Sequence, residues 1–264
     1  MKIKQLFTIF VIFFCTTSCS VLQKNHHTSV YDILPRDSFT FINKSLIIKS
    51  CFNGVCAEKE YGASGSGASV AKNKFGTYII TAAHICEDKN VPTDPTISSS
   101  STYQIISMKG EKHKAEVIST IYEKGVDICM LFAKGVHIDP VEIADRAPKA
   151  GDKIYNLAAP YSIGSPGAVP IMEGRYIGEV SKGLIAYSVP AAPGSSGSGL
   201  FNTKGELVGV LYAVYWKFHN ICLSNDFDIM KDFIAKTVEE YNRILKIDVG
   251  VTQELQKPLD LLKL

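Results

Sequence analysis

The chain has little excess of charge of either sign, and it lacks a long hydrophobic run. Its 264 residues include 28 Lys and Arg against 26 Asp and Glu, a formal net charge of +2. Lys2 and Lys4 account for that excess, so residues 19–264 are balanced, and we expect no nucleic-acid partner. Cysteines and histidines show no CxxC or other metal-ligand spacing, so neither a metal nor a cofactor is expected.

The N-terminus has the pattern of a secretory signal. Lys2 and Lys4 precede an apolar run at 6–14, which is too short to span a bilayer comfortably and is followed by small residues before Cys19. We expect a signal peptide at 1–18 and a tether at 19–44; an uncleaved anchor helix is the less favoured alternative. Cys19 also resembles the cysteine of a bacterial lipobox, although Thr16 stands where such boxes usually carry Leu. A lipidated Cys19 would attach the chain to the bacterial envelope, and plain cleavage would secrete it.

Cys51 and Cys56 flank Phe52, Asn53, Gly54 and Val55, and Asn-Gly between apolar residues is a strong hairpin signal. In a two-residue hairpin the two cysteines form a non-hydrogen-bonded pair with close Cα atoms, so a disulfide is feasible in an oxidising compartment. Two unpaired thiols are the alternative. The other cysteines of the mature chain, Cys86, Cys129 and Cys222, lie in apolar contexts and are predicted to be small buried hydrophobes.

Most of the remaining chain reads as short strands separated by Gly and Pro, which indicates an all-β sandwich or barrel. A connecting segment at 138–149 divides the strands into two groups. Apolar residues then recur at helical spacing from Met230 to Leu245. We expect a domain at 45–247, made of strand groups at about 45–137 and 150–224 and a helix at about 225–247, with a tail at 248–264. The expected strands include 45–51, 55–60, 65–72, 76–81, 103–109, 113–122, 127–133, 152–158, 174–180, 183–189, 206–214 and 220–223.

Three segments carry residues suited to nucleophilic catalysis. Ser196 lies in the glycine-rich turn 193–199, which can expose a hydroxyl and leave backbone N–H groups beside it. His84 follows an apolar strand and two alanines, whereas the other histidines lie in loop or solvated contexts. Asp127 opens a strongly apolar strand, where a carboxylate needs a hydrogen-bonding partner. A satisfied core histidine and a strand-start aspartate are the alternative interpretations.

The segments 65–70, 81–84, 127–131 and 194–198 together resemble the chymotrypsin (trypsin-like) serine proteases, with their His, Asp, Ser order. Residues 148–152 and 193–196 are similar to the bacterial Deg/HtrA-type branch, and 196–202 to glutamyl endopeptidases. The resemblance implies two six-stranded antiparallel β-barrels with the active site between them and the C-terminal helix outside. It also implies that Ser196 is the nucleophile, His84 the general base and Asp127 its orienting group, with an oxyanion hole from the N–H groups of Gly194 and Ser196.

The sequence departs from several branches of that family. Ser195 stands where digestive members carry Asp, and no PDZ domain follows the strands as it does in Deg-type enzymes. Leu211 replaces the histidine of glutamyl members, which argues against glutamate specificity. An uncharged pocket for a small or medium apolar side chain is expected from two groups of residues: Val189, Pro190, Ala191 and Ala192, and Leu211, Tyr212, Ala213 and Val214. The alternative is that these are simply barrel residues.

The sequence therefore predicts an exported serine endopeptidase that acts on protein or peptide substrates. A catalytically inactive binding module on the same fold is one alternative, because fold alone does not fix function. An esterase that uses the same three residues is another.

Overall fold

The computed structural model describes residues 29–88, 91–123, 125–215 and 217–261. The chain divides into two compact units, Met1–Asp32 and Ile33–Leu264, and both barrels belong to the second. The predicted signal peptide, together with Cys15 and Cys19, lies outside the described residues. A short helix, α2 (Val30–Ile33), and a 3-10 turn, η1 (Arg36–Ser38), precede the first strand.

The first six strands close into an antiparallel barrel with the order β1-β2-β3-β6-β5-β4. The central strands β3 and β6 are almost wholly buried, because their apolar side chains face the barrel interior on one side and packed neighbours on the other. The strands are β1 (Phe39–Phe52), β2 (Val55–Asn73), β3 (Gly76–Thr81), β4 (Ile97–Ser107), β5 (Lys112–Glu123) and β6 (Val126–Lys134), and the short helix α3 (Ala83–Cys86) follows β3.

The second barrel has the order β10-β11-β12-β9-β8-β7. Its strands are β7 (Lys153–Leu157), β8 (Ile171–Ser181), β9 (Leu184–Tyr187), β10 (Gly199–Phe201), β11 (Leu207–Tyr215) and β12 (Phe218–Asn225), with a 3-10 turn, η2 (Pro160–Ser162), after β7. The expectation of two closed six-stranded antiparallel barrels with a C-terminal helix is confirmed.

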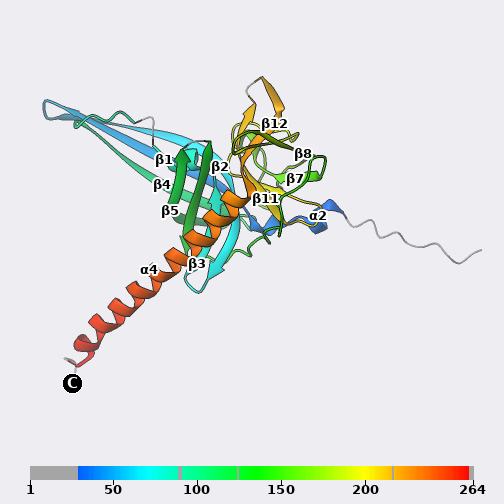
Figure 1. The fold of residues 1–264 in the computed structure, drawn as a ribbon. Coiled ribbons are helices and arrows are strands. Elements are labelled where there is room, and N and C mark those ends of the chain that lie inside the picture. Colours follow the sequence, from blue (N-terminus) through cyan, green and yellow to red (C-terminus); the bar gives the residue numbers. More distant parts are fainter. Residues whose placement is uncertain (1–28, 89–90, 124, 216, 262–264) are drawn as a thin grey trace, which may run out of the picture. The chain divides into compact units, whose positions relative to one another are not determined.

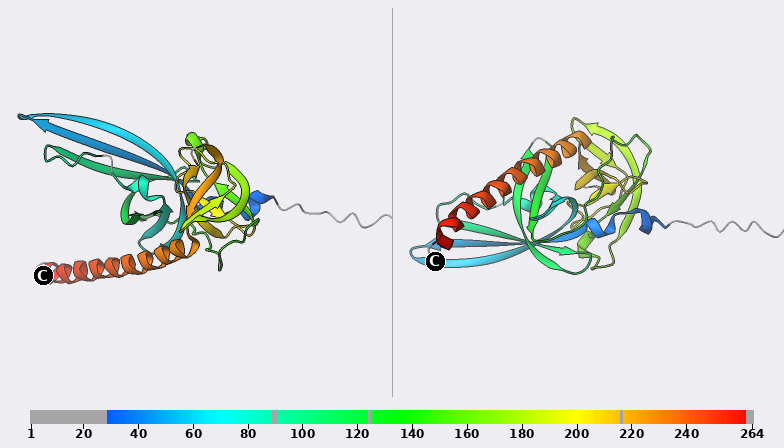
Figure 2. Two further views of the ribbon diagram at one scale, coloured as in Figure 1. Left: turned by 45° about the horizontal axis from the view of Figure 1, so that its top comes forward. Right: turned by 90° about the horizontal axis from the view of Figure 1, so that it is seen from below.

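Strands β1 and β2 form a hairpin that extends well beyond the first barrel (Figures 1 and 2). Its turn is the predicted Asn-Gly pair, with positive φ at Asn53 (49°) and Gly54 (79°). The expected register is confirmed: Cys51 faces Cys56, and the two form a disulfide with a Cα–Cα distance of 4.1 Å. The tip side chains Phe52 and Val55 are exposed.

Three expected boundaries in this region are wrong. Residues 39–44, expected in the tether, form the start of β1 and pair with both β2 and β4. The two strands expected at 55–60 and 65–72 are one strand, β2, because residues 61–64 between them stay paired with residues 43–46 of β1. Ser98–Ser101, which precede the strand expected at 103–109, belong to β4 and pair with β1.

The long helix α4 (Phe227–Leu261) follows the last strand, as Figure 1 shows. Asp226 caps it, since its Oδ1 accepts the N–H groups of Asp228 (2.9 Å) and Ile229 (3.2 Å). Asn242 Oδ1 accepts a hydrogen bond from Tyr78 Oη (2.9 Å), which anchors α4 to the first barrel. The helix continues beyond the expected end at 247 and through the expected tail. Gly250 does not stop it, because a glycine costs a helix about 1 kcal/mol but still donates its N–H.

Candidate active site

The His84 imidazole and the Asp127 carboxylate are in direct contact. The ring Nδ1 lies 2.8 Å from Asp127 Oδ2, and the backbone N–H of His84 donates to Oδ1 of the same carboxylate (3.1 Å). An ionised carboxylate only accepts, so Nδ1 must carry the proton, and Nε2 is left as the basic nitrogen. The Asp127 side chain is 9% exposed, whereas that of His84 is 31% exposed and accessible to a reactant.

The local sequence explains how His84 reaches this position. Strand β3 ends at Thr81, and Ala82, in an extended conformation (φ −81°, ψ 143°), starts the single turn of α3. Ala82 and Ala83 are both fully buried, so a larger side chain at either position would clash with the barrel. Their small size lets the chain turn tightly and bring the histidine to the barrel edge, as the sequence predicts.

Asn225, at the end of β12, holds the backbone of Asp127 from the second barrel. Its Oδ1 accepts the Asp127 N–H (2.8 Å), and its Nδ2 donates to the Asp127 carbonyl (2.9 Å). Asn225 is 1% exposed, so both bonds lie in a region without competing water. The sequence analysis did not identify this role of Asn225. One feature of the sequence could have indicated this role: Asn225 has an amide side chain, which both donates and accepts hydrogen bonds, and it lies at the end of a largely apolar strand.

Cys86 and Cys129 are buried, as the sequence predicts, and they form a disulfide with each other, a pairing that the sequence left open. Cys86 is two residues after His84, and Cys129 is two residues after Asp127. Cys129 faces Thr81 across the β3–β6 pair, and α3 folds back over that pair, so the sulfurs meet although they are 43 residues apart in sequence. The bond therefore ties α3, which carries the histidine, to the strand that carries the aspartate. Cys222 is buried as expected; it is a free cysteine, and burial raises the pKa of its thiol to about 12.

Tyr212 lies beside the carboxylate on strand β11. Burial, together with the negative charge of Asp127, raises the pKa of its phenol to about 12, so the hydroxyl stays protonated. That hydroxyl donates to the carbonyl of Gly125 (3.4 Å), just before β6. The ring also packs against the core cluster that contains Ala83 and Cys86. Tyr212, expected to contact substrate, is thus also part of the surroundings of the His84–Asp127 pair.

The turn that carries Ser196 is built on glycines with positive φ. Ser195 N–H donates to the carbonyl of Ala192 (2.9 Å), and Gly194 has φ +95°, the geometry of a type II turn with Pro193 at its second position. Gly197 has φ +86°, and a Cβ there would lie 2.0 Å from Thr81 Oγ1. Any side chain at Gly197 would therefore push the turn away from the first barrel.

Ser66, on β2 of the first barrel, fastens this turn. Its N–H donates to the Ser196 carbonyl (2.8 Å), and its hydroxyl donates to the Gly194 carbonyl (2.9 Å) and accepts from Ala159 N–H (3.1 Å). Ser66 is fully buried. The sequence singled out its neighbourhood only as part of a motif, and the structure gives Ser66 the specific role of joining the two barrels at the turn.

The carbonyl groups of residues 192–194 all accept hydrogen bonds from groups other than Ser196. Ala192 accepts from Ser195, Pro193 accepts from Tyr161 (2.6 Å), and Gly194 accepts from Ser66. In contrast, the N–H groups of Gly194 and Ser196 donate to no other group among the described residues. Two unengaged donors next to a serine are what an oxyanion hole requires. The hydrogen bonds of the described residues do not include one between the Ser196 hydroxyl and the His84 ring.

The residues expected to line a substrate pocket differ in exposure. Val189, Ala191 and Leu211 are buried at 0%, 6% and 1% exposure and act as barrel core. Ala192, Tyr212, Ala213 and Val214 are partly exposed, and Pro190 is exposed. Leu211 also accepts the Gly197 N–H (2.7 Å), which places β11 directly behind the serine turn.

Two closed six-stranded antiparallel barrels are the architecture of the chymotrypsin-like fold, the fold of the trypsin-like serine proteases. The family model "Trypsin-like peptidase domain" matches residues 65–210. That range is more than half of the 264 residues, and the chain belongs to this family. The resemblance to the trypsin-like serine proteases seen in the sequence is confirmed.

The chain is also similar to Exfoliative toxin A of Staphylococcus aureus, with 27% identity over 194 residues, 67% of this chain and 66% of the toxin. Among solved structures it resembles the serine endoprotease from Yersinia pestis (TM-score 0.58, 18% identity, 80% of this chain and 67% of that one). An HtrA-type protease with a decapeptide is another neighbour (TM-score 0.63, 14% identity, 80% of this chain and 67% of that one). At these identities the structural likeness shows the fold. In the part of the chain that the structure describes, every helix is too short or too polar to cross a bilayer.

Proposed function

We propose that the protein is an exported serine endopeptidase that cleaves peptide bonds through an acyl-enzyme. Ser196 is the nucleophile, His84 the general base and then acid, and Asp127 the group that fixes the imidazole. The observation that carries this proposal is the 2.8 Å contact between His84 Nδ1 and Asp127, together with a serine turn fastened to the same barrel by Ser66. The contact leaves Nε2 basic, as proton transfer from a serine requires.

In the proposed reaction, the Ser196 hydroxyl attacks the scissile carbonyl while His84 Nε2 takes its proton. The Asp127 carboxylate stabilises the imidazolium that forms, and the N–H groups of Gly194 and Ser196 stabilise the negative charge on the carbonyl oxygen. The imidazolium then donates its proton to the leaving amine, and the C–N bond breaks. Water, deprotonated by His84, hydrolyses the ester to regenerate Ser196. The missing hydrogen bond between Ser196 and His84 fits a free enzyme, in which such contacts are often long until substrate binds.

The side chains near the serine turn support a preference for small or medium apolar residues before the cleaved bond. Ala192, Ala213 and Val214 are partly exposed and uncharged. Leu211, where glutamyl members carry histidine, is buried in the barrel and offers no polar group. A pocket of this kind discriminates weakly between similar apolar side chains.

The proposal of export rests on the two disulfides and on the N-terminal pattern, because disulfides persist in oxidising compartments. Attachment through a lipid on Cys19 rests on the sequence alone. Metabolic labelling with palmitate tests it: the wild-type chain should incorporate label and Cys19→Ser should not. Label that persists in Cys19→Ser would reject this attachment site.

Labelling with a fluorophosphonate tests the catalytic proposal. The wild-type protein should react, and Ser196→Ala should not, with kcat reduced on the order of a millionfold. Ser195→Ala is the matched control. The Ser195 hydroxyl is next to Ser196 in sequence but fully buried, so the probe cannot reach it and this variant should be labelled like the wild-type protein. Labelling that survives Ser196→Ala would assign the nucleophile to another serine. A folded wild-type protein that never reacts would favour the non-catalytic binding module.

A further inference from the structure

A groove of about 880 Å³ lies against the first barrel, and His84 lines one end of it. One face of the β1–β2 hairpin forms its longest wall. Since side chains alternate along a strand, Lys44, Leu46, Ile48 and Ser50 point to the same face. Their partners on β2 are Ala63, Tyr61, Lys59 and Ala57, and all eight line the groove.

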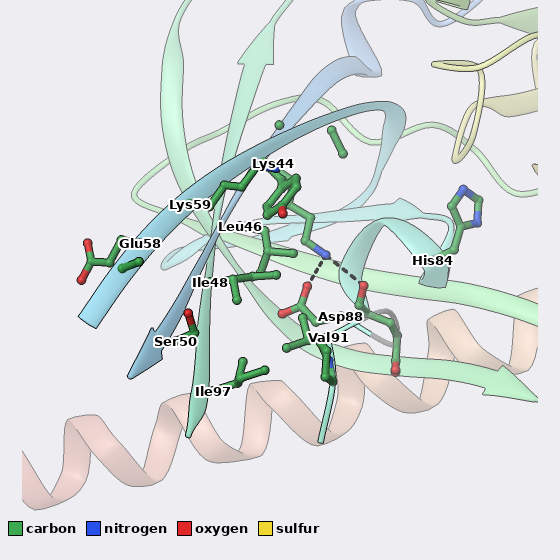
Figure 3. A pocket seen from close by; sticks show the side chains of 16 residues that line it. Lys44, Leu46, Ile48, Ser50, Glu58, Lys59, His84, Asp88, Val91 and Ile97 are labelled. Atoms are coloured by element: carbon green, nitrogen blue, oxygen red, sulfur yellow. Dashed lines mark hydrogen bonds and ion pairs between the residues drawn. The ribbon is translucent and has the colours of Figure 1, made fainter. Parts of the chain in front are cut away.

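The segment after α3 forms the opposite wall. Lys44 Nζ makes an ion pair with Asp88 (2.6 Å) and donates to the Glu87 carbonyl (2.9 Å), as Figure 3 shows. The Lys44 side chain is only 6% exposed, so its charge is neutralised inside the wall. Beyond this ion pair the groove is mainly apolar, with Leu46 and Ile48 facing Val91 and Ile97 (Figure 3).

The position of His84 decides which part of a substrate enters this groove. The general acid must reach the leaving amine, so the residues that follow the cleaved bond lie on the far side of the imidazole from the serine turn. All residues that line the groove come from the first barrel, between Lys44 and Ile97. The acyl part of the substrate instead lies at the turn 193–198 of the second barrel, beside the two N–H donors.

Strand β2 offers a backbone edge along the same path. It pairs with β1 from Val55 to Ala68 but with β3 only from Ala68 onward. Over residues 55–65, before Ser66 bonds to the serine turn, one edge of β2 has no partner strand in the described sheet. An extended peptide can add to such an edge and direct alternate side chains into a neighbouring pocket.

We infer that this hairpin groove binds the substrate segment that follows the scissile bond and selects large apolar side chains there. The inference rests on the proposed function and adds a substrate class to it: polypeptides with Leu-like or aromatic residues just after the cleavage site. The proposed specificity-determining residue is Leu46, the first aliphatic residue of β1 that lines the groove, two positions after Lys44 along the same face.

An acyl-transfer experiment measures binding on the leaving-group side of the scissile bond separately from binding of the acyl part. An ester substrate acylates Ser196, and added dipeptide amides then compete with water for the acyl-enzyme. We expect Leu-Leu amide to capture the acyl group about ten times more efficiently than Gly-Gly amide, because each leucine buries apolar surface in the groove. Leu46→Glu should remove most of that preference, measured as the ratio of the capture efficiencies of the two amides.

Ile47→Glu is the matched control, since Ile47 is the next residue on β1 and points to the opposite face. It should keep the wild-type preference. If Leu46→Glu fails to fold, Leu46→Ala should still lower the preference severalfold. Equal capture of the two amides by the wild-type enzyme, or equal effects of Leu46→Glu and Ile47→Glu, would overturn the inference. A wild-type protein that neither hydrolyses the ester nor reacts with a fluorophosphonate would instead refute the proposed function.

Discussion

Removal of the Cys86–Cys129 disulfide should destabilise the fold and lower the activity of the candidate site. The second disulfide, Cys51–Cys56, serves as the reference for the loss of stability. A disulfide stabilises mainly by limiting the unfolded chain, and its contribution grows with the loop that it closes. The two disulfides close loops of very different length, with sequence separations of 43 and 5. The loop-closure relation gives about 4 kcal/mol for the longer and about 2 kcal/mol for the shorter.

We therefore expect Cys86→Ala/Cys129→Ala to lose about twice as much free energy of unfolding as Cys51→Ala/Cys56→Ala. Urea denaturation followed by circular dichroism measures both values against the wild-type protein. Alanine suits the buried pair, because Cys86 and Cys129 are 8% and 0% exposed and a polar replacement would add a desolvation cost. Equal losses from the two double variants would refute the argument from loop length.

The two variants should also differ in activity. Without the Cys86–Cys129 bond, α3 can shift relative to β6, and a misplacement of about 1 Å can cost on the order of a hundredfold in rate. The His84–Asp127 hydrogen bonds remain, so we expect a loss of about tenfold in kcat and in the rate of fluorophosphonate labelling. The hairpin variant should keep wild-type kcat. An unchanged kcat in Cys86→Ala/Cys129→Ala would show that the disulfide does not position the proposed catalytic pair, His84 and Asp127.

Three further results are expected. Asn225→Ala should lower the free energy of unfolding by about 3 kcal/mol, because it leaves the buried N–H and carbonyl of Asp127 without partners. It should also lower kcat; a urea denaturation curve and a kcat equal to those of the wild-type protein would contradict this. Gly197→Ala should abolish fluorophosphonate labelling, because its Cβ would overlap Thr81 at positive φ, and retained labelling would show that the turn can move. Cys222 should resist iodoacetamide at pH 8 until the protein is denatured, as followed by peptide mass spectrometry, since a pKa raised to about 12 leaves almost no thiolate; rapid native alkylation would contradict its burial.

Local patterns in the sequence were sufficient for several features of the fold and the candidate site. The Asn-Gly turn fixes its own register, and with it the Cys51–Cys56 bond. Asp127 at the start of an apolar strand signals a need for a partner, and His84 supplies it. Each of these inferences depends on residues that are close in sequence or on a chemical requirement that few side chains can meet.

The missed features depend on contacts between distant segments. Cys86 and Cys129 meet only because β3 pairs with β6 and α3 folds back over that pair, which residue patterns do not show. The length of β2 was missed because its glycines look like turn signals. In the structure Gly65 lies against the second barrel, where a Cβ would come within 3.2 Å of the Ser196 carbonyl oxygen. Asn225 was missed because a buried amide that bonds to a backbone 98 residues away has no local signature.

The hydrogen bonds from Asn225 to the Asp127 backbone can form only late in the synthesis of the chain. All three proposed catalytic residues precede position 200, whereas this asparagine ends the last barrel strand. A chain synthesised only as far as residue 200 contains all three of these residues and yet lacks the amide that secures the aspartate backbone. Under the proposed function, full activity therefore requires the last barrel strand to be in place.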